Sequence, residues 1–168
     1  MATGDIVAAL RRVEVAALPA SPRFLMGAAN GGSAPAAEAV SFPADTPQYA
    51  AWAFQAPGSY AGAAIKLRIA ARASIGIVGA ARLEASFYRQ TTATAFSTVH
   101  TYAWQGVTWS APATLSQPAY VEIPFTQAQA DGVAAGDECF VLLRRATADV
   151  ADTLAGSVDL TTLALLLG

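Results

Sequence analysis

The fold is decided by the stretch Ala63-Ala64-Ile65-Lys66-Leu67-Arg68-Ile69-Ala70-Ala71-Arg72, in which apolar residues recur at every second position. A β-strand advances with a period of two residues, so this pattern predicts a strand with one face in an apolar core. The apolar face carries Ile65, Leu67, Ile69 and Ala71, and the opposite face carries Lys66, Arg68 and Arg72. One strand cannot satisfy its own backbone or cover its own apolar face, so the rest of the chain must supply a sheet.

Most other segments also read as short strands. The connections between them are short, and no helix alternates with them, which favours an antiparallel β-sandwich of the jelly-roll type. A hairpin is expected around Gln105-Gly106, between two runs of aromatic and β-branched residues. Thr126 to Val133 is predicted to form a helical turn or loop. The other predicted strands cover 38–42, 48–55, 81–90, 121–125, 139–143 and 157–167.

The composition is unusually poor in charge. Charged residues make up 13% of the chain and hydrophobic residues 54%, whereas an average soluble domain is about 25% charged. A neutral surface of this extent suggests that other subunits cover part of it, so a homo-oligomer is expected. The net charge of −2 and a single lysine argue against a nucleic-acid partner. No apolar run is long enough to cross a membrane as a helix.

The N-terminal residues are predicted to form an arm. Residues 4–18 suit a short helix with Ile6, Leu10 and Val13 on one side, or an extended segment, and are a candidate anchor on another protein. The Gly- and Ala-rich stretch 27–37 is expected to be a flexible linker. The predicted division is therefore an arm and linker over 1–37 and a jelly-roll domain over 38–168.

The last predicted strand has two apolar faces after Leu163. Burial on both sides, by the core and by a neighbouring subunit, would explain that pattern. Leu163, Leu165 and Leu167 are therefore candidate oligomer contacts.

Between Arg89 and Glu122 there is no charged residue, and the window is rich in Thr, Ser and aromatic residues. Flat rings beside hydroxyl groups can stack on sugars, so Tyr102, Trp104 and Trp109 are candidate carbohydrate-binding residues. The same rings would also suit the core or a subunit interface, where Trp and Tyr are common.

Catalytic and metal chemistry find little support. Cys139 lies in an apolar run, and the only histidine, His100, lies among uncharged residues, so neither a nucleophile nor a zinc site is expected. Asp149 and Asp152 could supply calcium ligands in one loop, but pairing with Arg144 or Arg145 is the simpler expectation. The remaining acids sit at turns rather than as an obvious pair of glycosidase carboxylates. No enzyme activity and no cofactor are predicted.

Two segments resemble a jelly-roll domain of virion proteins from tailed phages and gene transfer agents. The first is Tyr49-Ala50-Ala51-Trp52-Ala53-Phe54 with Pro57, Tyr60 and Gly62; the second runs from Gly136-Asp137 through Arg144-Arg145 to Asp159-Leu160. The resemblance implies a homotrimeric capsid decoration, head spike or fibre, held on the major capsid protein or another virion protein. It would be assembled in the bacterial cytoplasm and displayed on the virion surface.

The sequence therefore leaves two functions open. The first is a non-enzymatic virion structural protein attached through its N-terminal arm. The alternative is a carbohydrate-binding module of a phage-like particle, recognising host surface polysaccharide through the aromatic window.

Overall fold

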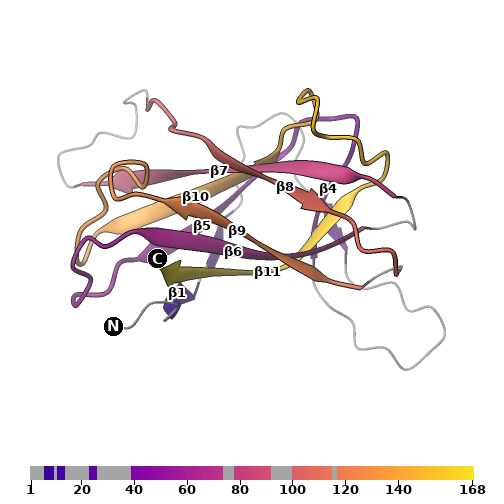
Figure 1. Ribbon diagram of the computed structural model, residues 1–168. Coiled ribbons are helices and arrows are strands. Elements are labelled where there is room, and N and C mark those ends of the chain that lie inside the picture. Colours follow the sequence, from indigo (N-terminus) through magenta and orange to yellow (C-terminus); the bar gives the residue numbers. More distant parts are fainter. Residues whose placement is uncertain are drawn as a thin grey trace.

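The computed structural model describes residues 6–9, 11–13, 23–25, 39–73, 78–91, 100–114 and 117–168. In these residues the protein is all-β, with two antiparallel sheets packed as a sandwich (Figure 1). The predicted fold class is therefore confirmed. The strands are β1 (Ile6–Ala9), β2 (Arg11–Val13), β3 (Arg23–Leu25), β4 (Ala39–Phe42), β5 (Tyr49–Gln55), β6 (Ile65–Ala73), β7 (Ala80–Gln90), β8 (Gln105–Ser110), β9 (Ala119–Phe125), β10 (Glu138–Arg145) and β11 (Val158–Leu167).

One sheet, called here the β6 sheet, has the order β3-β4-β11-β6-β9, and β1 also pairs with β11. The other, called the β7 sheet, has the order β2-β5-β10-β7-β8. In Figure 1 the β7 sheet lies above the β6 sheet. Neighbouring strands within each sheet are mostly distant in sequence, so residues far apart in the chain share each face.

The organising strand behaves as its alternation predicts. Ile65, Leu67, Ile69 and Ala71 of β6 are buried in the core between the sheets. The opposite face is charged, and Arg68 donates from Nε and Nη2 to Oε1 of Glu122 on β9, at 2.9 and 2.7 Å. The strand is an interior strand of its sheet, between β11 and β9.

Three phenylalanine rings join the two sheets through the core. Phe87 of β7 meets Phe54 of β5 with centroids 6.0 Å apart and Phe125 of β9 with centroids 4.7 Å apart, both edge to face. Such aromatic pairs contribute about 0.5–1.5 kcal/mol each beyond the burial of their surface.

The last strand contains a β-bulge that changes which residues face the core. The pairing with β6 shifts between Leu160 and Thr162, so Leu160 faces inward before the bulge and Leu165 faces inward after it. Leu163 packs partly buried against the core, and Leu167 is buried in it.

One apolar residue on the outer side of this strand is also buried within the same chain. Leu166 is buried, and it is paired with Ile6 of β1. The chain's own core buries Leu165 and Leu167, so these two are not available as oligomer contacts, whereas Leu163 is only partly buried and its role as an oligomer contact stays a prediction.

The N-terminal residues form strands where they are described. β1 pairs with β11, β2 with β5, and β3 with β4, so these parts of residues 1–37 belong to the two sheets. The helix expected over 4–18 is not present in its described residues, whereas the extended alternative agrees with β1 and β2. Ile6 and Val13 lie in these strands, and their role as an anchor on another protein stays a prediction. Leu10 and the predicted linker 27–37 lie outside the described residues.

The loop after β10 is held by a buried ion pair. Arg145 is 1% exposed, and its guanidinium donates to both carboxylate oxygens of Asp152, at 2.8 and 2.6 Å. It also donates to the carbonyl oxygens of Gly156, at 2.6 Å, and of Leu154. The predicted pairing of this loop with an arginine of β10 is confirmed.

Candidate functional site

The outer face of the β7 sheet carries a continuous row of ring side chains. Tyr102 and Trp104 belong to the segment 100–104 that leads into β8, and their ring centroids lie 5.8 Å apart. Tyr102 is 38% exposed and Trp104 is half-buried, so both reach the surface. The structure therefore brings together two of the three aromatic residues singled out in the sequence.

The row continues in both directions from these two residues. Trp104 contacts Tyr49 of β5, at 6.2 Å between centroids, and Tyr102 meets His100 edge to face, at 4.8 Å. His100 in turn meets Tyr88 of β7 at 4.9 Å, and Tyr88 contacts the partly exposed Phe140 of β10 at 6.1 Å. We call this set the aromatic row: Tyr49, Trp104, Tyr102, His100, Tyr88 and Phe140.

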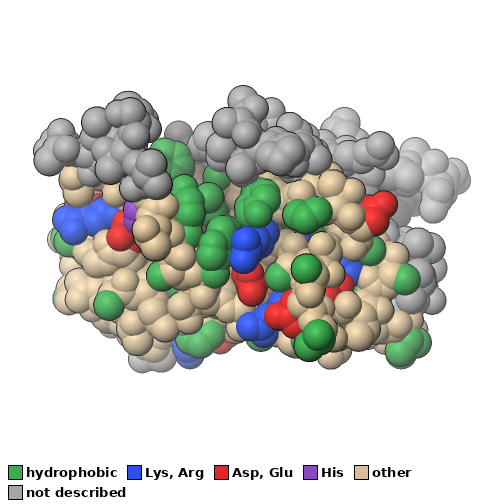
Figure 2. Space-filling view, turned by 90° about the horizontal axis from the view of Figure 1, so that it is seen from above, with side chains coloured by type: hydrophobic (Ala, Val, Ile, Leu, Met, Phe, Trp, Pro, Cys, Tyr) green, Lys and Arg blue, Asp and Glu red, His purple; other side chains and the backbone are tan. Residues whose placement is uncertain are grey.

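Strand register explains why these rings share one face. On β7 the inward residues are Leu83, Ala85 and Phe87, so Tyr88 points outward, and its partner across the ladder on β10 is Phe140. The rings of the segment 100–104 contact side chains of β5, β7 and β10, which shows that the segment crosses this face. In Figure 2, which looks down on this side of the molecule, hydrophobic side chains lie between the single histidine and a group of paired basic and acidic side chains.

One end of the aromatic row rests on an arginine. The guanidinium carbon of Arg144 lies over the Trp104 ring, 4.2 Å from its centroid, and 5.9 Å from the centroid of Tyr49. Arg144 also donates from Nε and Nη2 to Oε2 of Glu84 on β7, at 2.9 and 2.7 Å. Although burial alone would lower the pKa of Arg144, the hydrogen bond to Glu84 helps to hold that pKa above its ordinary value. Arg144 is therefore a permanent cation beneath the ring.

The other charges near the row are also paired. Arg82 lies on the same outer face, with its Nε 3.7 Å from a carboxylate oxygen of Asp149. A Cβ atom built on Gly106 would lie 2.6 Å from Nη2 of Arg82, so the missing side chain makes room for this guanidinium. At the far end of the row, Nε2 of His100 lies 3.8 Å from Oδ2 of Asp131, although no acid is near His100 in the sequence.

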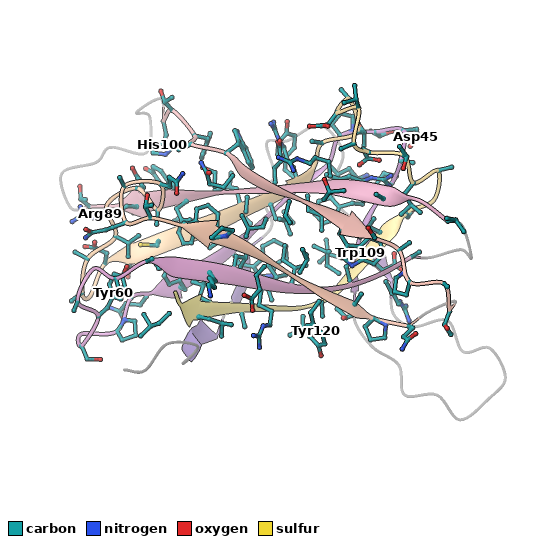
Figure 3. All side chains as sticks on the ribbon, viewed as in Figure 1. Asp45, Tyr60, Arg89, His100, Trp109 and Tyr120 are labelled. Atoms are coloured by element: carbon teal, nitrogen blue, oxygen red, sulfur yellow. The ribbon has the colours of Figure 1, made fainter. Side chains whose placement is uncertain are left out.

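The third predicted aromatic residue lies elsewhere. Trp109 is 2% exposed and points from β8 into the core, where its Nε1 donates to the carbonyl oxygen of Ala119 at 3.3 Å (Figure 3). It cannot contact a ligand at the surface, so its proposed role in sugar stacking is wrong and the core interpretation is correct. The expected hairpin at Gln105-Gly106 is also absent, because both residues lie inside β8.

The opposite sheet presents one exposed ring among the residues whose side chains are described. Tyr120 of β9 is 70% exposed on the outer face of the β6 sheet, opposite Ala70 of β6 (Figure 3). It is therefore separated from the aromatic row by the whole thickness of the sandwich.

Other candidate groups have structural roles in the described residues. Cys139 is buried in the core, and burial raises the pKa of its thiol to about 12, which leaves it protonated and unreactive. Asp152 is engaged by Arg145, and Asp149 lies beside Arg82. No group of three or more potential metal ligands occurs among the residues that the structure describes. In the same residues no helix is long and apolar enough to cross a membrane.

Sequence reasoning missed four members of the row and its arginine. Tyr88 carried a usable signal, because the alternation over 81–90 places it on the same side as Arg82, Glu84 and Ser86. Phe140 carried none, since it lies in an uninterrupted apolar run. Tyr49 and His100 join the row only through strand order.

No family model matches the chain, and no curated protein matches it. Among solved structures it is similar to the CBM22-1 xylan-binding domain of Xyn10C from Paenibacillus barcinonensis, with a TM-score of 0.50 and 9% identity over 99% of this chain and 97% of that one. It is also similar to TmCBM61 in complex with β-1,4-galactotriose, with a TM-score of 0.42 and 8% identity over 95% and 88% of the two chains. A third match, to the cycloalternan-forming enzyme from Listeria monocytogenes, has a TM-score of 0.45 and 12% identity, and covers 97% of this chain but 11% of the enzyme. At 9% identity the likeness to the xylan-binding domain shows the fold alone, a jelly-roll β-sandwich.

Proposed function

We propose that this protein is a non-catalytic carbohydrate-binding module and that the aromatic row is its binding surface. The observation that carries the proposal is the placement of Tyr102 and Trp104 side by side at the surface of an otherwise well-buried sandwich. Flat apolar rings with polar edges stack on the apolar faces of pyranose rings, and a run of adjacent rings can hold successive sugars of a chain.

The surroundings of the row favour binding over hydrolysis. A glycosidase needs one carboxylic acid free to give a proton and a second carboxylate free to act as base or nucleophile. Three acids near the row are already engaged: Glu84 by Arg144, Asp149 beside Arg82, and Asp131 by the backbone N–H of Arg89. Glu138 is exposed at the Phe140 end, but a single free carboxylate does not make the pair that a glycosidase needs.

The fold adds support of a coarser kind. A sandwich of the same fold, matching this chain over nearly its whole length, is a xylan-binding domain. At 9% identity the likeness transfers no ligand, so the identity of the sugar must come from the site.

The virion role remains a prediction that the comparisons do not favour. One of its premises is a last strand that needs a second subunit, whereas Leu165, Leu166 and Leu167 at the end of β11 are buried within one chain. Trimer formation and a capsid partner are likewise predictions, and size-exclusion chromatography with light scattering tests the first of them.

Affinity electrophoresis against a panel of soluble polysaccharides, followed by calorimetry on any that retard the protein, tests the proposed function. Trp104→Ala and Tyr102→Ala should each weaken binding at least about tenfold, as truncation of a central aromatic contact does. Tyr120→Ala is the matched control, because it removes a more exposed ring from the opposite sheet. Binding that survives both row variants, or that is lost in the control, would refute the proposal.

A further inference from the structure

We infer that Arg144 supports the inner face of the Trp104 ring, a role we call its pedestal, and does not itself contact the ligand. The aromatic row consequently binds an uncharged glycan on the outward face of Trp104. The inference rests on the proposed function and adds to it a positioning residue and a ligand class.

The first step is the position of the guanidinium. Arg144 belongs to β10, the middle strand of the β7 sheet, whereas Trp104 belongs to the segment that crosses the outer face of that sheet. The guanidinium lies over the ring 4.2 Å from its centroid, which is stacking distance. One face of the indole is therefore occupied by the protein, and a sugar has only the other face to stack on.

The second step is that the Nε–Nη2 edge of the guanidinium is not free for a ligand carboxylate. Its Nε and Nη2 both donate to Glu84, and Nη1 lies 3.5 Å from the hydroxyl of Tyr49. An arginine that recognises an anion directly presents two parallel N–H groups to it. In this site the edge that would do so already holds a carboxylate.

The third step is the charge of the surroundings. Arg144 with Glu84, and Arg82 with Asp149, are neutral pairs. The other end of the row has Asp131, next to His100, and Glu138, which is exposed two residues before Phe140. A uronate or sulfated chain laid along the row would meet negative charge there, whereas the arginines near the row whose side chains the structure describes, Arg82, Arg89 and Arg144, are each already paired with an acid.

The Arg68–Glu122 pair provides a matched control within the chain. Arg68 donates from the same two nitrogens to one oxygen of Glu122, at the same 2.9 and 2.7 Å, on the outer face of the opposite sheet. Arg144→Met and Arg68→Met therefore remove the same kind of ion pair, but only the first removes the support of Trp104.

The experiment compares a neutral xylan or mixed-linkage glucan with polygalacturonate, each at low and high salt. Wild type should bind a neutral glycan with an affinity that salt does not change, and should not bind polygalacturonate. Arg144→Met should weaken binding by between about twofold and thirtyfold, the range of a stacked cation–π contact, while Arg144→Lys keeps part of the affinity and Arg68→Met keeps all of it. Glu84→Gln, which frees the guanidinium edge, should gain a salt-sensitive affinity for polygalacturonate.

Acrylamide quenching of tryptophan emission provides a readout that does not need a ligand. The other two tryptophans, Trp52 and Trp109, are buried, so a change reports on Trp104. Quenching should rise in Arg144→Met and stay unchanged in Arg68→Met. Unchanged quenching and affinity in Arg144→Met would overturn the pedestal role, and salt-sensitive binding of polygalacturonate by wild type would overturn the ligand class while leaving the proposed function standing. Failure to bind any glycan would overturn the proposed function itself and the ligand class with it, whereas the quenching result would still decide the pedestal.

Discussion

Replacing Arg145 with Leu should be among the most damaging single changes in the chain. The substitution leaves the Asp152 carboxylate, whose side chain is 4% exposed, without its cation, and it removes the donor to the Leu154 and Gly156 carbonyl oxygens. Removing one partner of a buried pair typically lowers the free energy of unfolding by about 3–5 kcal/mol. For a chain of this length each kcal/mol corresponds to about 2–4 °C in Tm, so the expected loss is about 6–20 °C.

Urea unfolding followed by circular dichroism measures this loss, and an unchanged m-value shows that the comparison is valid. The double variant Arg145→Leu/Asp152→Asn should be more stable than Arg145→Leu alone. It removes the unpaired charge, while the side-chain oxygen of the introduced amide can still accept the hydrogen bond that Asp152 takes from the backbone N–H of Arg82 at 3.0 Å. A loss below about 1 kcal/mol in the single variant, or a double variant that is less stable than the single, would refute the reasoning.

Three further changes test other parts of the fold. Burial raises the pKa of Asp159 above its ordinary value, so the contribution of this carboxyl group to stability falls as pH rises from its unfolded-state pKa through its folded-state pKa. Urea titrations at several pH values should show that Asp159→Asn removes this dependence and is more stable than wild type at pH 7. A variant that is less stable at pH 7 would contradict this. A Cβ atom on Gly79 would lie 2.9 Å from the backbone Cα of Leu154, whereas one on Gly106 would meet only the mobile end of the Arg82 side chain. Gly79→Ala should therefore lower the free energy of unfolding by about 1–3 kcal/mol, and Gly106→Ala by less than about 1 kcal/mol. Equal losses in the two variants would count against the close packing of Gly79 on Leu154. The Cys139 thiol, with a pKa of about 12, should react with Ellman's reagent at pH 8 only after unfolding, and prompt reaction of the native protein would show that it is not buried.

The fold was predictable because, in the strands that form its core, apolar and polar residues alternate along the sequence itself. In 63–72 and 81–90 the inward residues are apolar and most outward ones are charged or polar, so period two alone identifies β6 and β7. The last strand was harder. Its bulge near Thr161 changes the inward-facing residues from even-numbered to odd-numbered ones. Because leucines occupy both even and odd positions in this run, the sequence does not reveal where that change occurs.

The N-terminal strands could not be recognised from their own residues. β1 and β2 are four and three residues long, too short for a period to be counted, and they are stabilised by pairing with β11 and β5. The helical spacing of Ile6, Leu10 and Val13 fitted a helix equally well. Pairing with β11 and β5 selects the strand conformation over the helix, and that pairing cannot be predicted from the residues of the segment alone.

The candidate site was predictable only in part, since it is assembled from four segments. The charge-free window drew attention to Tyr102, Trp104 and Trp109 together, but the direction of each ring depends on where β8 begins. Because β8 starts at Gln105, Trp109 falls on its inward side and Trp104 stays on the crossing segment. The neighbours from β5, β7 and β10 then follow from a strand order that no local pattern reveals.

The central claim, that a glycan stacks on the aromatic row, is tested most directly by the indole N–H resonances of the three tryptophans. A two-dimensional ¹H–¹⁵N spectrum would be recorded during titration with the neutral polysaccharide that retards the protein most. The account predicts that the Trp104 resonance shifts progressively to saturation, while those of the core residues Trp52 and Trp109 stay in place. A Trp104 resonance that does not move when the protein is saturated with glycan would contradict it.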